Sequence, residues 1–279
     1  MGQPAASSSR AGRNLPAAIA SGVGLAILIL VTLFTWKWTF AVLAIAAALM
    51  AAHELIQAFG GRGIHIARTP FIITTVALPA VAYVWGLPAE IVAMGIAVLF
   101  VLFWRIRRGI EDYVRDVTAS VFVIAYLPFM MGFAMLMLAA ENGPQRVLTF
   151  ILLSSSNDIA GYAAGVMFGK HPMAPSISPK KSWEGFAGSV IVQALVGALA
   201  FVYLLDAPWW QGVVAGMVLT VTATAGDFVE SALKRDLGVK DMGSLLPGHG
   251  GMMDRLDSLI PNAFVAWALF ILFLGGGIA

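Results

Sequence analysis

Residues 121–140 read VFVIAYLPFMMGFAMLMLAA and contain no charged side chain. A helix of this length spans about 30 Å, which matches the thickness of the hydrocarbon core of a bilayer. The stretch therefore predicts a membrane-spanning helix, and we expect that helix to extend over 116–140.

The composition of the whole chain agrees with this prediction. The 279 residues are 59% hydrophobic and 11% charged, and the mean hydropathy is +0.86. Soluble domains are about one quarter charged, and a single core of this size could not bury so much apolar surface. The composition excludes an ordinary soluble domain, a disordered chain and a nucleic-acid-binding domain. Because cysteine is absent, disulfides, thiolate nucleophiles and cysteine-ligated metals are excluded as well.

The same length criterion, applied outward along the chain, predicts an all-α polytopic integral membrane protein with nine spanning helices. They are expected over 16–35, 38–59, 69–87, 88–104, 116–140, 145–169, 184–205, 209–233 and 259–277. Gly86-Leu87-Pro88 separates the third helix from the fourth, which form either a tight hairpin or a re-entrant pair. We expect 1–15 to be a disordered cytoplasmic tail, 16–144 to be a scaffold that gives access to lipid, and 145–279 to carry the chemistry.

Lysines and arginines predict the orientation of these helices. With a cytoplasmic N-terminus, all of them except Lys37 and Arg146 fall in cytoplasmic segments. We interpret the acidic residues at the opposite end, Glu90, Glu141 and Asp206, as loop charges. The C-terminus is then expected on the outer side.

Three further charged sites lie within or beside the predicted helices. Segment 105–116 is interpreted as a solvated positive anchor, with contact to anionic lipid headgroups as the alternative. His53 and Glu54 are interpreted as interhelical hydrogen-bonding residues rather than ligands. Asp158 lies within the sixth helix in the run SSSND at 154–158. The ladder Gly161, Gly165 and Gly169 is typical of close helix packing, but a carboxylate at membrane depth needs a partner, a metal or water.

Two further helical turns carry several polar side chains on one face. The first stripe, at i, i+3, i+4 and i+7, consists of Asp227, Glu230, Ser231 and Lys234. The second stripe, at the start of the ninth helix, consists of Asp254, Asp257 and Ser258. Facing lipid would be costly for either stripe, so we expect both to face protein or water.

The segments around these stripes are rich in lysine, serine and glycine. They are Lys170-His171, Ser178-Pro179-Lys180-Lys181-Ser182, Lys240-Asp241 and Pro247-Gly248-His249-Gly250-Gly251. Carboxylates suit a hard cation, lysines suit phosphate oxygens, and glycines allow close approach of the backbone. The pattern indicates a site for Mg²⁺ and a polyphosphate, with a structural network of ion pairs as the alternative.

The run from Ser231 through Lys240-Asp241 and Gly248-His249-Gly250-Gly251 to Asp254-Arg255-Leu256-Asp257-Ser258 resembles the signature of the phosphatidate cytidylyltransferases, or CDP-diacylglycerol synthases. Two further stretches, from Asp158 to His171 and from Ser178 to Gly185, resemble the same family. The resemblance covers roughly 150–262, and the first half of the chain matches only in hydropathy. Asn157 and Ser182 are small departures from the family pattern.

The resemblance implies transfer of a cytidylyl group from CTP to phosphatidic acid with release of pyrophosphate. It implies a Mg²⁺-dependent, homodimeric enzyme of the inner (plasma) membrane, with its active site facing the cytoplasm. The family's metal site carries over onto Asp227 and Asp254, to which we add Asp158, Glu230 and Asp257. Further catalytic candidates are Lys234, Arg235, Lys240, Asp241, His249 and Arg255. Candidates for substrate binding are Lys170, Ser178, Lys180, Lys181, Ser231, Gly250 and Gly251.

Several alternatives stay open at this point. His249 is a general base or phosphate contact, or it has a conformational role in its turn, and Lys170-His171 leaves the same choice. A sibling enzyme that acts on an ether lipid or another lipid phosphate would carry the same motifs. A secondary transporter also has intramembrane carboxylates, but it should show two related halves with polar residues near the midplane.

Overall fold

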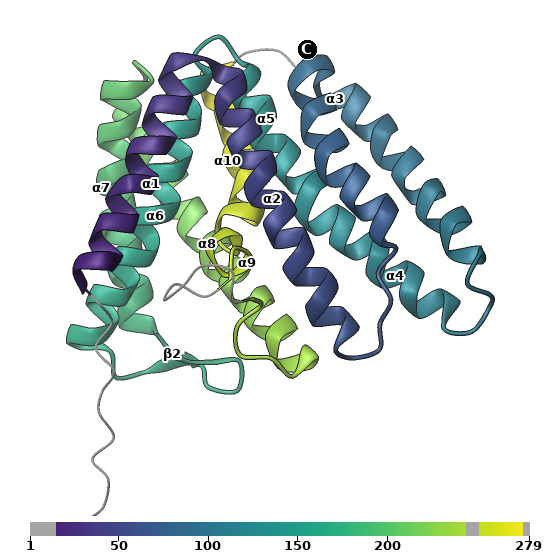
Figure 1. Ribbon diagram of the computed structural model, residues 1–279. Helices are drawn as coiled ribbons and strands as arrows, with labels where there is room; N and C mark the ends of the chain where they lie inside the picture. The colour runs from purple at the N-terminus through teal and green to yellow at the C-terminus, as the bar shows by residue number, and fades with distance from the viewer. Residues whose placement is uncertain (1–14, 244–250, 276–279) are drawn as a thin grey trace, which may run out of the picture.

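The computed structural model describes residues 15–243 and 251–275, with side chains from residue 22 onward. The predicted tail over 1–15 therefore lies almost entirely outside the described residues. The elements are α1 (Leu15–Thr35), α2 (Lys37–Gly60), α3 (Arg68–Ile106), α4 (Tyr113–Ile124), the π-helix η1 (Ala125–Phe129), α5 (Met130–Ala139), α6 (Gly143–Phe168), β1 (Pro172–Ala174), β2 (Ser178–Ser182), α7 (Trp183–Leu204), α8 (Trp209–Leu237), α9 (Met253–Leu256) and α10 (Leu259–Leu274) (Figure 1).

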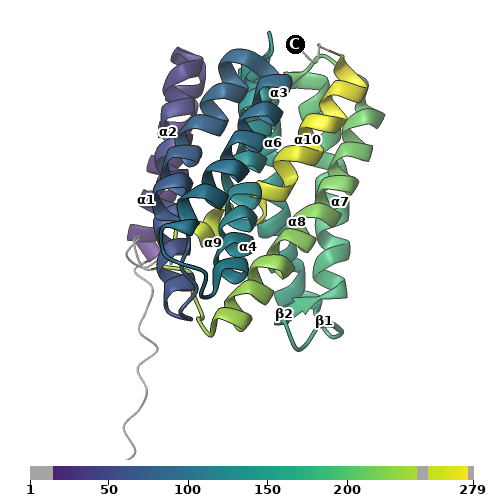
Figure 2. The same ribbon diagram turned by 90° about the vertical axis from the view of Figure 1, so that its right-hand side faces the viewer.

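The helices form a bundle whose long axes run roughly alongside one another (Figures 1 and 2). In the described part of the chain, six helical segments are long and apolar enough to cross a membrane. They are Lys37–Gly60, Arg68–Ile106, Tyr113–Ala139, Trp183–Leu204, Trp209–Leu237 and Met253–Leu274. An all-α membrane bundle is therefore confirmed as the fold class.

The 39 residues of α3 do not form one straight rod. A straight helix of this length would separate its ends by almost 60 Å, about 1.5 Å per residue, yet Arg68 and Arg105 line the same pocket. The chain doubles back at Gly86, whose φ of 76° and ψ of −174° are outside the helical region. Glycine tolerates this conformation because it has no Cβ. The tight hairpin between 69–87 and 88–104 is the arrangement found (Figure 1).

The helix expected over 116–140 is continuous but not uniform. Its middle is the π-helix η1, which contains Pro128. Proline cannot donate the usual backbone hydrogen bond and its ring crowds the preceding turn, and a single wider turn accommodates it. Tyr126 lies within this turn.

Glycines set the spacing of α6, α7 and α8. A Cβ on Gly185 of α7 would press on the backbone of Gly161 and Gly165 in α6, so the predicted glycine ladder does mediate close helix packing. Gly197 of α7 and Gly212 of α8 approach each other so closely that a Cβ on either would collide with the carbonyl group of the other.

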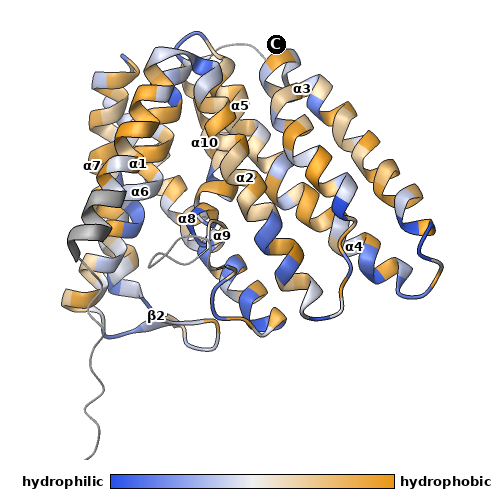
Figure 3. Cartoon of the chain, in the orientation of Figure 1, coloured by the Kyte–Doolittle hydropathy of each residue, from blue (hydrophilic) through white to orange (hydrophobic). Residues whose placement is uncertain are grey.

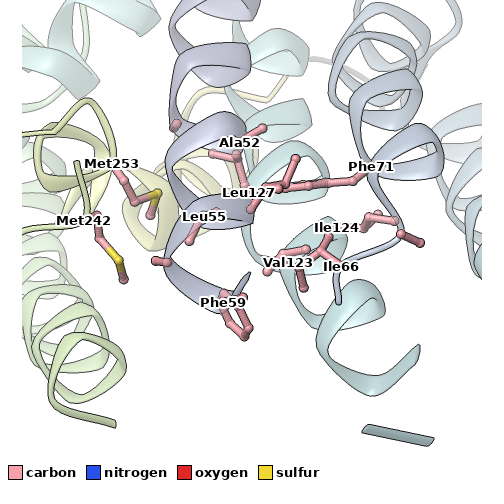
Figure 4. Close-up of a cluster of buried hydrophobic side chains, with 14 of the residues drawn as sticks. Ala52, Leu55, Phe59, Ile66, Phe71, Val123, Ile124, Leu127, Met242 and Met253 are labelled. Carbon is pink, nitrogen blue, oxygen red and sulfur yellow. The ribbon is translucent and has the colours of Figure 1, made fainter. Parts of the chain in front are cut away.

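The end of the bundle that carries β2 and the end of α8 is rich in hydrophilic residues, whereas the helices above it are mostly hydrophobic (Figure 3). Two buried apolar clusters fill the interior. The first joins α2, α3, α4 and η1 to Met242 and Met253 (Figure 4). It connects the N-terminal helices to the segments that carry the family signature.

Between α6 and α7, where no spanning helix is predicted, the chain forms a two-stranded antiparallel hairpin, with Ala174 paired to Ser178. The last helix, α10, begins at Leu259 as predicted, and Asp254 and Asp257 lie just before it in the helical segment Met253–Leu274. Two expectations need correction. Segment 105–116 is not wholly solvated, since Arg105 and Asp116 form a buried ion pair of 2.9 Å.

Glu90 is the second correction, because it is not a loop charge. The turn at Gly86 places Glu90 inside the second arm of α3, where it is fully buried. Its carboxylate fills the space that the missing side chain of Gly132 leaves in α5. Neither oxygen has a hydrogen-bond partner among the described residues.

The glycine contact between α7 and α8 gives a test of this packing. We expect Gly212→Ala to destabilise the protein by ~1–3 kcal/mol, the usual range for overpacking a tight contact, because the new Cβ meets the Gly197 carbonyl. The apparent Tm in detergent should fall by several degrees. Gly95→Ala is the matched control, since a Cβ there meets nothing within 4 Å. Equal Tm values for the two variants would contradict the contact.

Candidate active site

The last turns of α8 present three charged side chains toward other elements. Asp227 is half-buried and forms an ion pair with Lys181 of β2. Glu230, one turn further on, is buried, and Lys234 follows one turn after it. The predicted polar stripe on this helix therefore faces protein at Asp227, Glu230 and Lys234.

Lys234 links α8 to the signature segment near α9. Its ammonium group donates to Glu230 Oε2 at 2.5 Å and to Asp254 Oδ1 at 2.8 Å. The other oxygen of Asp254 accepts the backbone N–H groups of Met242, at 3.1 Å, and Gly251, at 2.9 Å. Asp254 therefore ties together the two ends of the chain on either side of residues 244–250.

Asp257 and Asp158 extend the cluster toward α6. The Asp257 side chain interacts with that of Asp227, so the second carboxylate turn faces the first. Ser258 Oγ donates to Asp158 Oδ2 at 3.4 Å, and Asn157 Nδ2 donates to Asp158 Oδ1 at 3.2 Å. Carboxylates from α6, α8, α9 and the turn after α9 thus come together from positions up to about 100 residues apart.

The charges in this cluster do not balance. Its five carboxylates, Asp158, Asp227, Glu230, Asp254 and Asp257, meet the ammonium groups of Lys181 and Lys234. The buried Oε1 of Glu230 has no hydrogen-bond partner in the described part of the chain. Hard oxygen donors with excess negative charge suit a divalent cation such as Mg²⁺. Within residues 15–243 and 251–275, no three acidic or histidine side chains are grouped closely enough to hold a metal directly.

The β1–β2 hairpin positions Lys181. Ser182 caps α7 as predicted, because its Oγ accepts the Gly185 N–H at 3.1 Å. Glu184 accepts the N–H of Lys170 at 3.0 Å, and its other oxygen lies 2.5 Å from His171 Nδ1. His171 therefore helps to close the hairpin.

The other candidates lie around the cluster, and of these Gly251 contacts it through its hydrogen bond to Asp254. Lys170 and Lys180 are exposed on the hairpin, and Ser178 is half-buried there. The residues near the end of α8 and after it are Ser231, which is half-buried, and Arg235, Lys240 and Asp241, which are exposed. Gly251 is buried beside Asp254, and Arg255 is exposed. His249 and Gly250 lie outside the described residues.

Two residues of the N-terminal half reach this site. Glu54 of α2 is buried, and its two oxygens accept the N–H groups of Met252 at 2.9 Å and Met253 at 2.8 Å. Its interpretation as an interhelical hydrogen-bonding residue is confirmed. The same prediction is wrong for the described hydrogen bond of His53, which is to Gln57 within α2. Tyr126 of η1 has a buried hydroxyl group without a described partner, and it lies within the electrostatic field of Glu230, Asp257 and Asp227. No motif around Tyr126 could have identified it from the sequence.

The Glu54 contact gives a second test. We expect Glu54→Gln to raise hydrogen exchange of the Met252 and Met253 amides about tenfold or more, since an amide accepts less strongly than a carboxylate and its NH₂ group cannot accept. Hydrogen-exchange mass spectrometry of the peptide that contains both residues would measure this. Gln57→Ala, on the same helix, is the control and should leave the exchange unchanged. Unaltered exchange in Glu54→Gln would refute the anchoring role.

Comparison with known proteins agrees with this geometry. Residues 16–273 match the family model described as "Cytidylyltransferase family". The chain is 38% identical to the phosphatidate cytidylyltransferase of Mycobacterium leprae, over 98% of this chain and 92% of that protein. It is 38% identical to that of Mycobacterium tuberculosis H37Rv, over 97% and 86% of the two chains. It is 31% identical to that of Staphylococcus aureus, over 89% and 94%. The signature resemblance is confirmed, and the chain belongs to the cytidylyltransferase family.

Proposed function

We propose that this protein transfers the cytidylyl group of CTP to phosphatidic acid, which yields CDP-diacylglycerol and pyrophosphate. The observation that carries the proposal is the carboxylate and lysine cluster formed by β2, α8 and α9, in a chain that matches phosphatidate cytidylyltransferases over almost its full length. The cluster lies toward the hydrophilic end of an apolar bundle (Figure 3). A water-soluble nucleotide and a lipid phosphate would meet at such a boundary.

In the proposed reaction a phosphate oxygen of the lipid attacks the α-phosphorus of CTP. A new P–O–P bond forms, the bond between the α-phosphorus and the bridging oxygen to the β-phosphorus breaks, and pyrophosphate leaves with the electron pair. The second pKa of a phosphate monoester is about 6, so the lipid phosphate is already largely ionised at neutral pH. The reaction therefore needs no strong general base.

The main obstacle is the approach of one anion to another. Lys181 uses one described hydrogen bond on Asp227 and Lys234 uses two, whereas an ammonium group has three donors. The remaining donors can bind phosphate oxygens and stabilise the charge that develops on the leaving group. Asp227 and Asp254 are the carboxylates proposed to bind Mg²⁺, and Glu230, Asp257 and Asp158 are further candidates. Because no three of these side chains are grouped closely enough within the described residues to hold a metal directly, water and substrate phosphates would supply the remaining ligands, and the ion would add charge neutralisation when bound.

We propose nine membrane crossings with a cytoplasmic N-terminus. The carboxylate cluster then faces the cytoplasmic side of the inner membrane. Of the six apolar helical segments, α3 crosses twice because of its turn at Gly86. Helices α1 and α6 supply the other two crossings. Basic residues at the hydrophilic end support this orientation. A homodimer is proposed from the family resemblance alone.

A direct assay tests the function. Purified protein with labelled CTP, phosphatidic acid and Mg²⁺ should form CDP-lipid and pyrophosphate, and EDTA should stop the reaction. We expect Asp227→Asn and Asp254→Asn each to lower turnover by at least about 10²-fold, the typical effect of removing one preorganised charged contact. Asp206→Asn, an exposed aspartate in the connection between α7 and α8, should retain full turnover. Near-wild-type turnover of both site variants would refute the assignment, and a preference for another lipid phosphate would change the substrate.

The absence of native cysteine allows a test of orientation. Ser176→Cys, in the β1–β2 turn, and Glu141→Cys, between α5 and α6, both place a thiol at an exposed position. On intact cells a membrane-impermeant maleimide should label the Glu141 variant and not the Ser176 variant. Inverted vesicles should show the opposite labelling. The reverse result in both preparations would invert the proposed topology.

A further inference from the structure

A pocket with three arginines in its lining lies away from the carboxylate cluster. It is lined by His65, Ile66, Ala67, Arg68, Trp104, Arg105 and Arg108. One wall is the connection between α2 and α3, and the other is the end of α3 with the turn that follows it. Helix α2 and the apolar cluster that includes Leu55, Phe59, Ile66 and Val123 lie between this pocket and Met253 (Figure 4).

Buried hydrogen bonds hold the two walls together. Asp116 is fully buried, and its oxygens accept the His65 N–H at 3.0 Å and the Arg105 Nε–H at 2.9 Å. Arg105 also donates to the carbonyl oxygens of Gly109, at 3.0 Å, and Glu111, at 2.6 Å. The pocket is therefore preformed, because each wall is bonded to the same buried ion pair.

The residues that line this pocket carry excess positive charge, although Arg108 also lines an adjoining pocket with Glu111, Asp112 and Asp116. Asp116 neutralises Arg105, and Arg115 is paired with Asp112 at 2.9 Å. The guanidinium groups of Arg68 and Arg108 have no ion pair or hydrogen bond among the described residues. Arg68 is also the first residue of α3, where the helix dipole disfavours a positive charge. Two uncompensated guanidinium groups at a fixed pocket suit a phosphate group, which they can bind through paired N–H donors.

The side chains beside the pocket indicate where that phosphate comes from. Ile110, Val114 and Phe103 are 95%, 76% and 68% exposed, next to the arginines in sequence. The Arg107 guanidinium lies 3.3 Å from the centre of the Trp104 ring, and tryptophan is typical of the membrane interface. Exposed apolar side chains that neighbour the arginines of a basic pocket in the sequence suit a molecule with both acyl chains and a phosphate.

We propose that Arg68 and Arg108 bind the headgroup phosphate of an anionic membrane lipid, at a site separate from the carboxylate cluster. The lipid's acyl chains would lie against Phe103, Ile110 and Val114. Arg105 and Asp116 are positioning residues in this site, since they hold its walls and are already paired with each other.

The test uses the full-length protein in phosphatidylcholine vesicles that contain spin-labelled phosphatidylglycerol. Electron paramagnetic resonance measures the fraction of labelled lipid that is immobilised by the protein. We expect Arg68→Gln and Arg108→Gln each to weaken this association about fivefold, the effect of losing one basic contact with an anionic lipid. Arg108→Lys should retain part of the association, because it keeps the charge and loses the paired donors.

Arg107→Gln is the matched control, since Arg107 lies in the same turn, carries the same charge and does not line the pocket. It should weaken the association much less than Arg108→Gln. Equal effects of the two variants, or no effect of either pocket variant, would overturn the proposal. Inorganic phosphate should displace the lipid more strongly than chloride at equal ionic strength, because it competes for the same paired N–H donors. Equal displacement by the two salts would show charge screening alone and overturn the phosphate site, and displacement by inorganic phosphate at a concentration no higher than that of the lipid would assign the pocket to a free anion and overturn the lipid assignment.

Discussion

The hydrogen bonds of Lys234 to Glu230 and Asp254 are the contact on which the rest of the site depends. Ionised carboxylates in a low-dielectric interior are stable only when they are paired or hydrogen-bonded. This requirement couples α8 to the signature segment, because Lys234 is the ammonium group that the described contacts give to both Glu230 and Asp254. Lys181 does the same for Asp227 from the β1–β2 hairpin. The site is acidic because it contains more carboxylates than lysines. It is held together because Lys181 and Lys234 each connect side chains from separate elements of the bundle.

The N-terminal half is more than a hydrophobic support for this site. Glu54 accepts two consecutive backbone N–H groups of the signature segment, which orients Asp254 one residue later. Tyr126 brings a buried hydroxyl group toward the same carboxylates from a π-helical turn, and such turns occur frequently at functional sites. The apolar cluster around Leu55 fixes α2 between α4 and Met253 (Figure 4). All of these contacts lie within residues 16–273, which match the family model.

The two polar regions of the protein differ in their chemistry. The carboxylate cluster has excess negative charge, suited to a cation and the phosphates that accompany it. The pocket at Arg68 and Arg108 has excess positive charge and a preformed shape, suited to a phosphate alone. Both lie toward the hydrophilic end of the bundle (Figure 3). A protein with this arrangement can carry out chemistry on one lipid phosphate while it holds another as a stable contact with the membrane.

The sequence by itself determined the fold class, the family and the two facing carboxylate turns, because apolar length, helical periodicity and motif spacing are local properties. It also identified the turn at Gly86 and the helix cap at Ser182, which depend on a few neighbouring residues. Only the tertiary structure decided the partners of Glu54 and Tyr126 and the burial of Glu90 and Asp116. Those outcomes depend on which distant segment supplies the partner: a backbone N–H group, an arginine or the space beside a glycine. Contacts between residues so far apart in the chain leave no pattern in the neighbouring sequence.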